Sequence, residues 1–587
     1  MVLHLGHISS QRPPFYKLDI ASLLLVLAGV LWGIKQRSGL PVVPLLTPDS
    51  WGYLHPALSW LGGAGFQQTE GRDWLYPAIV ALILRVGNDF SSIVRVQQCL
   101  CLAGAPLLWL SIRIWLSLFP KRSAMCHGIA VFLGAAAAAI YLLNTTQVRF
   151  ELTIQPESVF AFFVLVYLVF VVAFIRARWV SHQTTAAIVF GAASLLISYS
   201  CLLLKPSWGF ALIPSLILVI AGVFGPGLLS LRVAPATLGV LVTVGLFLSP
   251  HLLGFKTDSD SRTFLPFTLV SIHAAQILQN AEQYHSIGSD EQQVIPSDNQ
   301  GRFYQELKQV WLESRNAPLP CPTLGFSPDY IMHVKDFFHA FESEQKLTDA
   351  QLINLCYSSY FKTWIESPSA MLIKVGKQLA IFLSAPSTDF AAHSVKRQQA
   401  VDLAARFGLS PQALLKEAES KDYLRNQPAF LAYLRNLESL YSQGWQIDCL
   451  NWLRWLVTIL ARLATFIQIG FFIAQFPVFL IRRFSGFRLP ALAVVIISAA
   501  VYGNMLTVGI VNTLDLDRYR TSYVPPLLVT LTMMTTFLFA VIERWFRHAK
   551  DSRPSEDARE AGDLMKRSTQ KETDFNSSCP SYPPKHA

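Results

Sequence analysis

The chain has 587 residues, of which 52% are hydrophobic and 15% are charged, and its formal net charge is +10. Soluble domains carry about 25% charged residues, so this composition excludes an ordinary cytosolic globular protein and a disordered one. The apolar residues come in long runs separated by short charged connectors. Because a bilayer core requires about 20 mostly apolar residues per helix, these runs predict transmembrane helices.

The positive charge has a simple source in such a protein, because basic residues accumulate in cytoplasmic connectors. No base-reading motif or compact basic domain is present, so we expect no nucleic-acid partner. No His and Cys spacing typical of a zinc site occurs either, and we expect no bound metal as a structural element.

The first apolar run, Ile20–Ile34, is short enough for the core of a signal peptide, but no small-x-small cleavage site follows it. We therefore predict an uncleaved first helix with its N-terminus in the cytoplasm. Ten spans are predicted in all, at 20–34, 92–119, 127–144, 156–175, 185–204, 208–225, 236–252, 453–481, 489–512 and 523–543.

The basic connectors fix the orientation of these spans. With ten spans and a cytoplasmic N-terminus, all of them fall on the cytoplasmic side. They are Lys121 with Arg122, Arg176 with Arg178, Arg232, Arg482 with Arg483 and Arg488, and Arg544 with Arg547. Both termini are then cytoplasmic, and two long segments lie on the opposite, exoplasmic face.

The predicted fold is an all-α polytopic membrane protein in four parts. Residues 1–252 form an N-terminal transmembrane module whose first exoplasmic loop, 35–91, contains interfacial helices. Residues 253–451 form an exoplasmic loop domain, 452–545 the C-terminal transmembrane helices, and 546–587 a disordered cytoplasmic tail.

The loop domain is too long for a simple connection and is expected to be mainly helical. Its pattern predicts helices over Asp349–Trp364 and Met371–Leu383. The second is short and basic, which leaves a membrane span and an amphipathic surface helix both open. From its size and placement, we expect the domain to act as a lid or acceptor platform over the first loop.

The first exoplasmic loop concentrates polar and aromatic residues next to the membrane. Asp49 precedes an aromatic segment that includes Tyr53, and Arg72 precedes an apolar helix that includes Tyr76. A transferase that takes a lipid-linked substrate needs such a place, because the lipid stays in the bilayer while its polar head meets carboxylates and cations at the surface. Alternatively, Asp49 caps the helix that begins at Ser50.

Further charged residues are predicted at the exoplasmic ends of later spans. Glu157 begins a span after Pro156, where it either binds substrate or favours the helix N-terminus. Lys205, Arg518 and Arg520 are candidates for holding phosphate; otherwise such residues extend to lipid headgroups.

These motifs resemble those of the GT-C superfamily of membrane glycosyltransferases, in the branch of protein O-mannosyltransferases and aminoarabinose transferases. The resemblance covers the topology loosely and the first 90 residues more specifically. The residues that carry it are Pro48-Asp49-Ser50-Trp51-Gly52-Tyr53, Arg72-x-x-Leu75-Tyr76-Pro77, Leu204-Lys205-Pro206, and Asp517-Arg518-Tyr519-Arg520 with Tyr523-Val524-Pro525-Pro526. One departure is Ser50 beside Asp49, where many relatives carry paired acids, so the use of a divalent metal stays open.

The resemblance implies a glycosyltransferase that uses a polyprenyl-phosphate-linked sugar as donor and acts on the exoplasmic face. Asp49 would then be the general base, and Arg72, Lys205, Arg518 and Arg520 would hold the donor phosphate. Tyr53, Tyr76 and Glu157 would bind substrate. Beyond membrane lipids, the implied partners are the donor and a lipid, glycan or protein acceptor.

Two other functions fit the topology. A transporter or flippase of lipid-linked sugars would also have many spans and a basic cavity, although no internal repeat is visible. The hypothesis of a structural membrane protein would explain the loop domain but would give no reason for the charged motifs. We expect a bacterial inner membrane with a periplasmic site, and an endoplasmic-reticulum membrane is the alternative.

Overall fold

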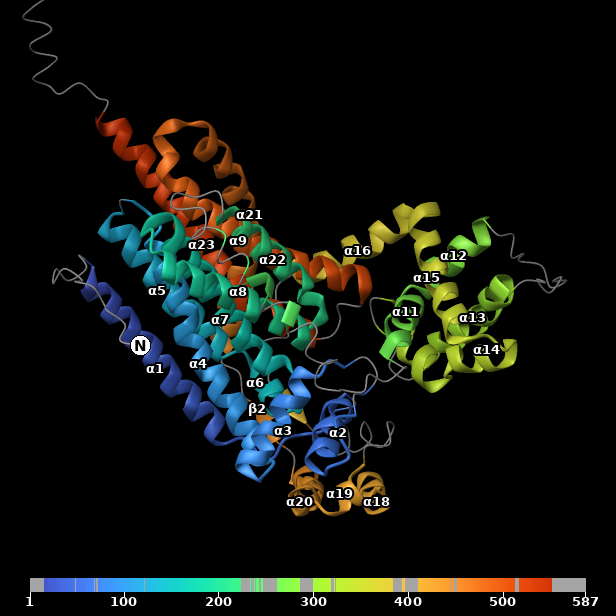
Figure 1. Ribbon diagram of the computed structural model, residues 1–587. Helices are drawn as coiled ribbons and strands as arrows, with labels where there is room; N and C mark the ends of the chain where they lie inside the picture. Colours follow the sequence, from blue (N-terminus) through green and yellow to red (C-terminus); the bar gives the residue numbers. More distant parts are fainter. Residues whose placement is uncertain are drawn as a thin grey trace, which may run out of the picture.

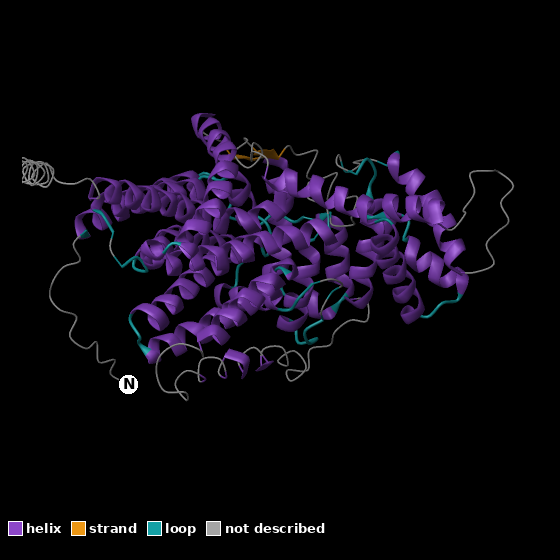
Figure 2. Ribbon diagram, turned by 90° about the horizontal axis from the view of Figure 1, so that it is seen from above, coloured by secondary structure: helices purple, strands orange, loops and turns teal. Residues whose placement is uncertain are grey.

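The computed structural model describes residues 15–47, 49–67, 69, 72–120, 122–222, 261–284, 299–317, 321, 324–383, 393–395, 410–443, 445–447, 451–512 and 517–551, with isolated residues between 223 and 260. Within these residues the protein is almost entirely helical, which confirms the predicted fold class (Figures 1 and 2). One antiparallel pair of short strands, which the sequence analysis did not predict, joins β1 (His393–Val395) to β2 (Trp445–Ile447).

The N-terminal part contains long apolar helices and, between some of them, shorter helices. They are α1 (Tyr16–Ser38), α2 (Ser50–Leu61), α3 (Leu75–Gly87), α4 (Ser91–Leu116), α5 (Ala124–Leu142), α6 (Thr145–Glu151), α7 (Glu157–Ile175) with the π-turn η1 (Arg176–Val180), α8 (Thr184–Leu204), the 3₁₀ turn η2 (Pro206–Trp208) and α9 (Gly209–Ala221).

The remaining helices form the loop domain and the C-terminal spans. They are α11 (Ser261–Ile272), α12 (Ala274–Tyr284), α13 (Asn299–Arg315), the π-turn η4 (Tyr330–Val334), α14 (Phe337–Gln345), α15 (Asp349–Glu366), α16 (Pro368–Leu383), α18 (Pro411–Ser420), α19 (Asp422–Arg425), α20 (Pro428–Gln443), α21 (Asn451–Leu480), the 3₁₀ turn η5 (Arg482–Phe487), α22 (Arg488–Val511) and α23 (Asp517–Asp551).

Eight described helices are long and apolar enough to cross a membrane, and each coincides with a predicted span. The chain is therefore a polytopic helical membrane protein. The predicted span 208–225 corresponds to the shorter apolar helix α9, and most of 236–252 lies outside the described residues. α7 lies at the centre, packed between α4 and α8, because it is apolar on every side.

The connectors predicted to be cytoplasmic meet at one end of the bundle. Ser123 donates to Glu543 over 2.8 Å, and the rings of Phe119 and Phe487 pack edge to face with centroids 5.6 Å apart. Arg178 donates to the Gly222 carbonyl over 2.7 Å, which places the end of α9 beside the end of α7. Successive helices thus run in alternating directions, as the predicted topology requires.

At the opposite end of the bundle, a buried ion pair joins α1 to α6. Arg37, at the end of α1, is 4% exposed, and Glu151, at the end of α6, is fully buried. The guanidinium donates twice to the carboxylate, each time over 2.6 Å, and twice to the Leu142 carbonyl, each time over 3.4 Å. A bidentate pair of this kind fixes the end of α1 against α6.

The long segment between α9 and α21 packs in two separate places. Helices α11 to α15 form their own apolar core, around residues such as Phe303, Phe338 and Leu352, to one side of the bundle (Figure 1). Helices α18 to α20 instead join the main core. They cover α2 through stacked rings: Trp51 lies on Phe430 with centroids 6.2 Å apart.

Helix α16 connects the loop helices to the bundle. It follows α15 after a single residue and packs along α22. Lys374 is 5% exposed and donates to the carbonyls of Gly509 and Asn512 over 2.9 and 3.0 Å. The basic residue that complicated the prediction for Met371–Leu383 therefore caps the end of α22, and α16 is a boundary helix, too short for a span.

The buried ion pair gives the first prediction. Arg37→Met leaves Glu151 charged in a place without water, so the free energy of unfolding in detergent falls by about 3–5 kcal/mol. The measurement is an unfolding titration of the purified protein. The control is Arg425→Met, which removes a pair whose side chains are 59% and 84% exposed and leaves stability unchanged. Equal effects from the two variants would contradict the anchoring role of Arg37.

Candidate functional site

Two of the loops predicted to be exoplasmic in the N-terminal module are joined by their backbones. Leu45 and Thr153 form a parallel bridge: the Leu45 N–H donates to the Leu152 carbonyl over 2.7 Å, and the Ile154 N–H donates to the Leu45 carbonyl over 3.4 Å. Two residues later, the Gln155 amide donates to the Thr47 hydroxyl over 2.8 Å. The segment that leads into Asp49 is therefore held against the segment that leads into Glu157.

Below this junction, a buried polar chain runs back to the ion pair of Arg37 and Glu151. The Gln97 amide donates to the carbonyls of Glu151 and Thr153 over 3.0 and 2.9 Å, and its oxygen accepts from the Tyr76 hydroxyl over 3.0 Å. Tyr76 is 2% exposed. It therefore supports the site from within, and its predicted contact with substrate remains untested.

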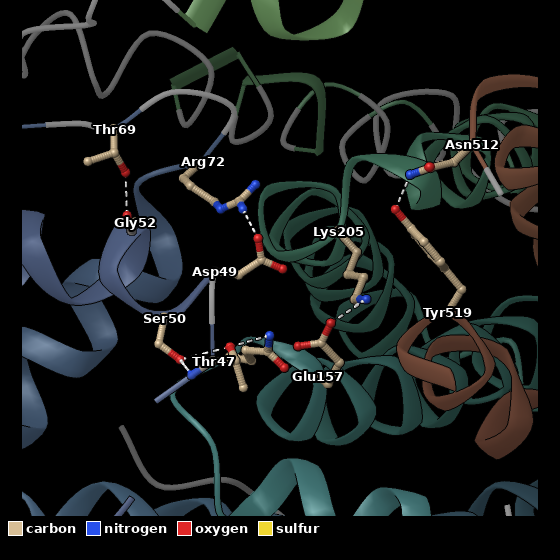
Figure 3. Close-up of polar contacts among 11 residues, drawn as sticks. Thr47, Asp49, Ser50, Gly52, Thr69, Arg72, Glu157, Lys205, Asn512 and Tyr519 are labelled. Atoms are coloured by element: carbon tan, nitrogen blue, oxygen red, sulfur yellow. Dashed lines mark hydrogen bonds and ion pairs between the residues drawn. The ribbon is translucent and has the colours of Figure 1, made fainter. Parts of the chain in front are cut away.

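Asp49 and Arg72, which the sequence analysis placed in one site, form an ion pair (Figure 3). Asp49 precedes α2 but makes no side-chain cap, so the structure favours the charged pair over the capping alternative. Gly52 makes room for it: a Cβ there would lie 3.3 Å from both Arg72 Cγ and Thr69 Oγ1. Thr69 donates to the Gly52 carbonyl, which fixes the Arg72 loop over α2.

Two aromatic rings lie close to the Arg72 guanidinium. Its carbon is 5.1 Å from the ring centroid of Tyr53 and 5.8 Å from that of Phe264. Tyr53 packs edge to face on Tyr76, with centroids 5.2 Å apart. Phe264 belongs to α11, so the loop domain reaches the first exoplasmic loop at the arginine of the ion pair.

Glu157 and Lys205 form the second ion pair of the site, over 2.7 Å (Figure 3). Glu157 is the first residue of α7, and Lys205 follows the last residue of α8, where Pro206 ends the helix. They are 3% and 6% exposed, so Lys205 turns inward and does not extend to headgroups. Its ammonium also lies 5.1 Å from the ring centroid of Tyr519.

Tyr519 is the residue of the late motif that the structure brings to this pair. The Asn512 amide donates to its hydroxyl, which ties the start of α23 to the end of α22 (Figure 3). The sequence analysis had chosen the arginines on either side. The side chain of Arg518 lies outside the described part of the chain. Arg520 is half-buried near the start of α23, and its role in binding phosphate stays a prediction.

Asp73 is a further acid beside Arg72 that the sequence analysis did not select. Burial raises the pKa of its carboxyl to about 6, and the side chain lies near Tyr199 of α8. A signal was present in the sequence, since an acid follows the arginine directly, but only the fold shows that it is partly buried. Among the described residues, no three His, Cys, Asp or Glu side chains lie close enough together to hold a metal ion.

Comparison with known proteins adds one distant similarity. The chain is similar to the oligosaccharyltransferase of Archaeoglobus fulgidus in its apo form, with 12% sequence identity and a TM-score of 0.34. The similarity covers 90% of this chain and 52% of that one, so the chain spans about half the length of that protein. No family model and no curated protein matches the chain.

Asp73 gives a prediction about pH. Because the folded state raises the pKa from 3.8 to about 6, folding disfavours the charged carboxylate. The stability contributed by the protonated acid is present below about pH 4 and is lost as the pH rises through about 6. Melting temperatures measured from pH 4 to 7 will therefore fall more for the wild type than for Asp73→Asn. Parallel curves would contradict the raised pKa.

Proposed function

We propose that the protein is a membrane glycosyltransferase that moves a sugar from a polyprenyl-phosphate-linked donor to an acceptor on its exoplasmic face. The observation that carries this proposal is the presence of two acid–cation pairs whose acids, Asp49 and Glu157, follow two joined segments. Asp49 with Arg72 and Glu157 with Lys205 lie at the predicted exoplasmic end of the bundle. A lipid-linked donor would meet them there while its chain stays in the bilayer.

The cations suit the leaving group of such a reaction. A guanidinium carries five N–H donors and an ammonium three, so each can bind more than one acceptor. Arg72 and Lys205 would thus add donor phosphate to their existing ion pairs and stabilise the charge that develops as the sugar departs. The rings of Tyr53 and Phe264 lie close to the Arg72 guanidinium, and these contacts favour a defined orientation toward phosphate.

Asp49 would act as the general base. The acceptor oxygen or nitrogen forms a bond to the anomeric carbon while the bond from that carbon to the phosphate oxygen breaks. The acceptor proton passes to the Asp49 carboxylate, and polyprenyl phosphate leaves with the electron pair of the broken bond. The pairing with Arg72 supports this role, since a nearby cation favours the ionised, proton-accepting form of a carboxylate.

A third prediction tests the base. The purified chain receives a panel of labelled polyprenyl-phosphate sugars with membrane extract as acceptor source, and transferred label is counted. Asp49→Asn lowers turnover by about 10²–10⁴-fold while donor binding stays near the wild-type level. The control is Asp89→Asn, an exposed acid of the same loop whose carboxylate accepts from Ser91. Binding of donor without transfer by any of the three proteins would favour a flippase.

A fourth prediction concerns the loop domain, which we propose acts as a lid held at Arg72. Phe264→Ala removes one of the two rings on the guanidinium and lowers turnover about three- to tenfold. Phe264→Tyr keeps the ring and retains wild-type turnover. If the alanine and tyrosine variants have equal rates, the ring contact does not contribute to the reaction.

A further inference from the structure

The turn between α6 and α7 holds two buried oxygen atoms that no hydrogen-bond donor of the described residues reaches. Gln155 is 5% exposed and Glu157 is 3% exposed. Among the described residues, Oε1 of Gln155 and Oε2 of Glu157 have no hydrogen-bond partner. Buried polar atoms are nearly always satisfied, so two of them within three residues require an explanation.

Both oxygens are held in place by the other end of their own side chains. The Gln155 nitrogen donates to Thr47 Oγ1 over 2.8 Å, and Thr47 Oγ1 lies 2.9 Å from Ser50 Oγ. The other Glu157 oxygen accepts from Lys205 over 2.7 Å. Because each side chain is anchored, the remaining oxygens cannot rotate away to find a partner elsewhere.

The neighbouring phenol does not supply the missing hydrogen bonds. Tyr76 lies close to this turn: burial first, and then the charge of Glu157, raise the pKa of its hydroxyl well above the ordinary value. The hydroxyl therefore keeps its proton, and donates it to Gln97 over 3.0 Å. The acceptor atoms of the turn remain available to a ligand.

The chemistry of these atoms selects the ligand. An amide oxygen and a carboxylate oxygen only accept hydrogen bonds, so the ligand must donate. A phosphate diester is itself only an acceptor, so it cannot donate a hydrogen bond to these oxygens. A sugar ring offers several hydroxyl donors, and the Lys205 ammonium beside Glu157 leaves the position with little net charge.

We propose that Gln155 and Glu157 form a subsite for the sugar of the lipid-linked donor, in which each accepts a hydrogen bond from a sugar hydroxyl. This inference rests on the proposed function and divides the site into two regions. The cations Arg72 and Lys205 take the phosphate, and the turn at the head of α7 takes the sugar.

The test uses the full chain in lipid nanodiscs and measures affinity for soluble donor analogues. The probes are farnesyl phosphate, a set of farnesyl-phosphate-linked hexoses, and monodeoxy versions of whichever hexose binds best. Gln155→Met keeps the volume of the side chain and removes its acceptor. Glu157→Gln keeps an acceptor for Lys205 and replaces the second oxygen with a donating nitrogen. The control is Ser215→Ala, a buried hydroxyl that bonds Tyr167 within the bundle.

The expected result is selective. Gln155→Met weakens hexose-lipid binding about three- to tenfold and Glu157→Gln about tenfold, while farnesyl phosphate binds all proteins within about twofold. A deoxy analogue that lacks the relevant hydroxyl binds wild type and variant equally, as a thermodynamic cycle requires for a direct contact.

Four results would overturn the inference. Equal loss of farnesyl phosphate and hexose-lipid binding would mean that the turn binds phosphate or only supports the fold. Unchanged binding in both variants would mean that the two oxygens contact water alone. If the wild type binds farnesyl phosphate as tightly as the hexose lipids, the sugar subsite fails but the lipid-phosphate site stands. If it binds neither, the proposed function fails as well.

Discussion

Arg37 leaves the end of α1 and forms a bidentate ion pair with Glu151 where neither side chain reaches water. Charges withdrawn from water are tolerated only when they are paired and hydrogen-bonded, so this contact admits one arrangement of the two segments. Gln97 then binds the backbone of Glu151 and Thr153, Tyr76 binds Gln97, and the bridge at Leu45 aligns the two loops. The position of Asp49 relative to Glu157 follows from these contacts.

The site built on this frame contains two ion pairs that are each neutral overall. An anionic donor would find neither a strongly positive pocket nor a repelling one. Its phosphate would share Arg72 and Lys205 with the carboxylates that now hold them, and this would make Asp49 available near the acceptor. Aromatic contacts on Arg72, from Tyr53 and Phe264, connect the same event to the loop domain. Binding of the donor would then affect both the catalytic residues and the loop domain.

The sequence predicted most of the membrane architecture because length and polarity alone decide which segments cross a bilayer. It also predicted α2, α3, α15 and α16. Contacts between residues far apart in the sequence were harder to predict. Arg37 and Glu151 are 114 residues apart, and nothing in the sequence around either one indicates their contact. Asp49 looked equally suited to a helix cap until Arg72 was placed beside it. Gln97, Gln155 and Tyr519 were missed because a single amide or phenol in an apolar segment has no motif, and its role appears only when its neighbours are known.

The most direct test of the account is a cryo-EM structure of the full chain in nanodiscs with a bound polyprenyl-phosphate-linked sugar. We expect phosphate density between Arg72 and Lys205, with the anomeric carbon facing Asp49 and the lipid chain running into the bilayer. Phosphate density at the other end of the bundle, beside Arg122 and Arg178, would contradict it. So would a lipid whose phosphate contacts neither Arg72 nor Lys205.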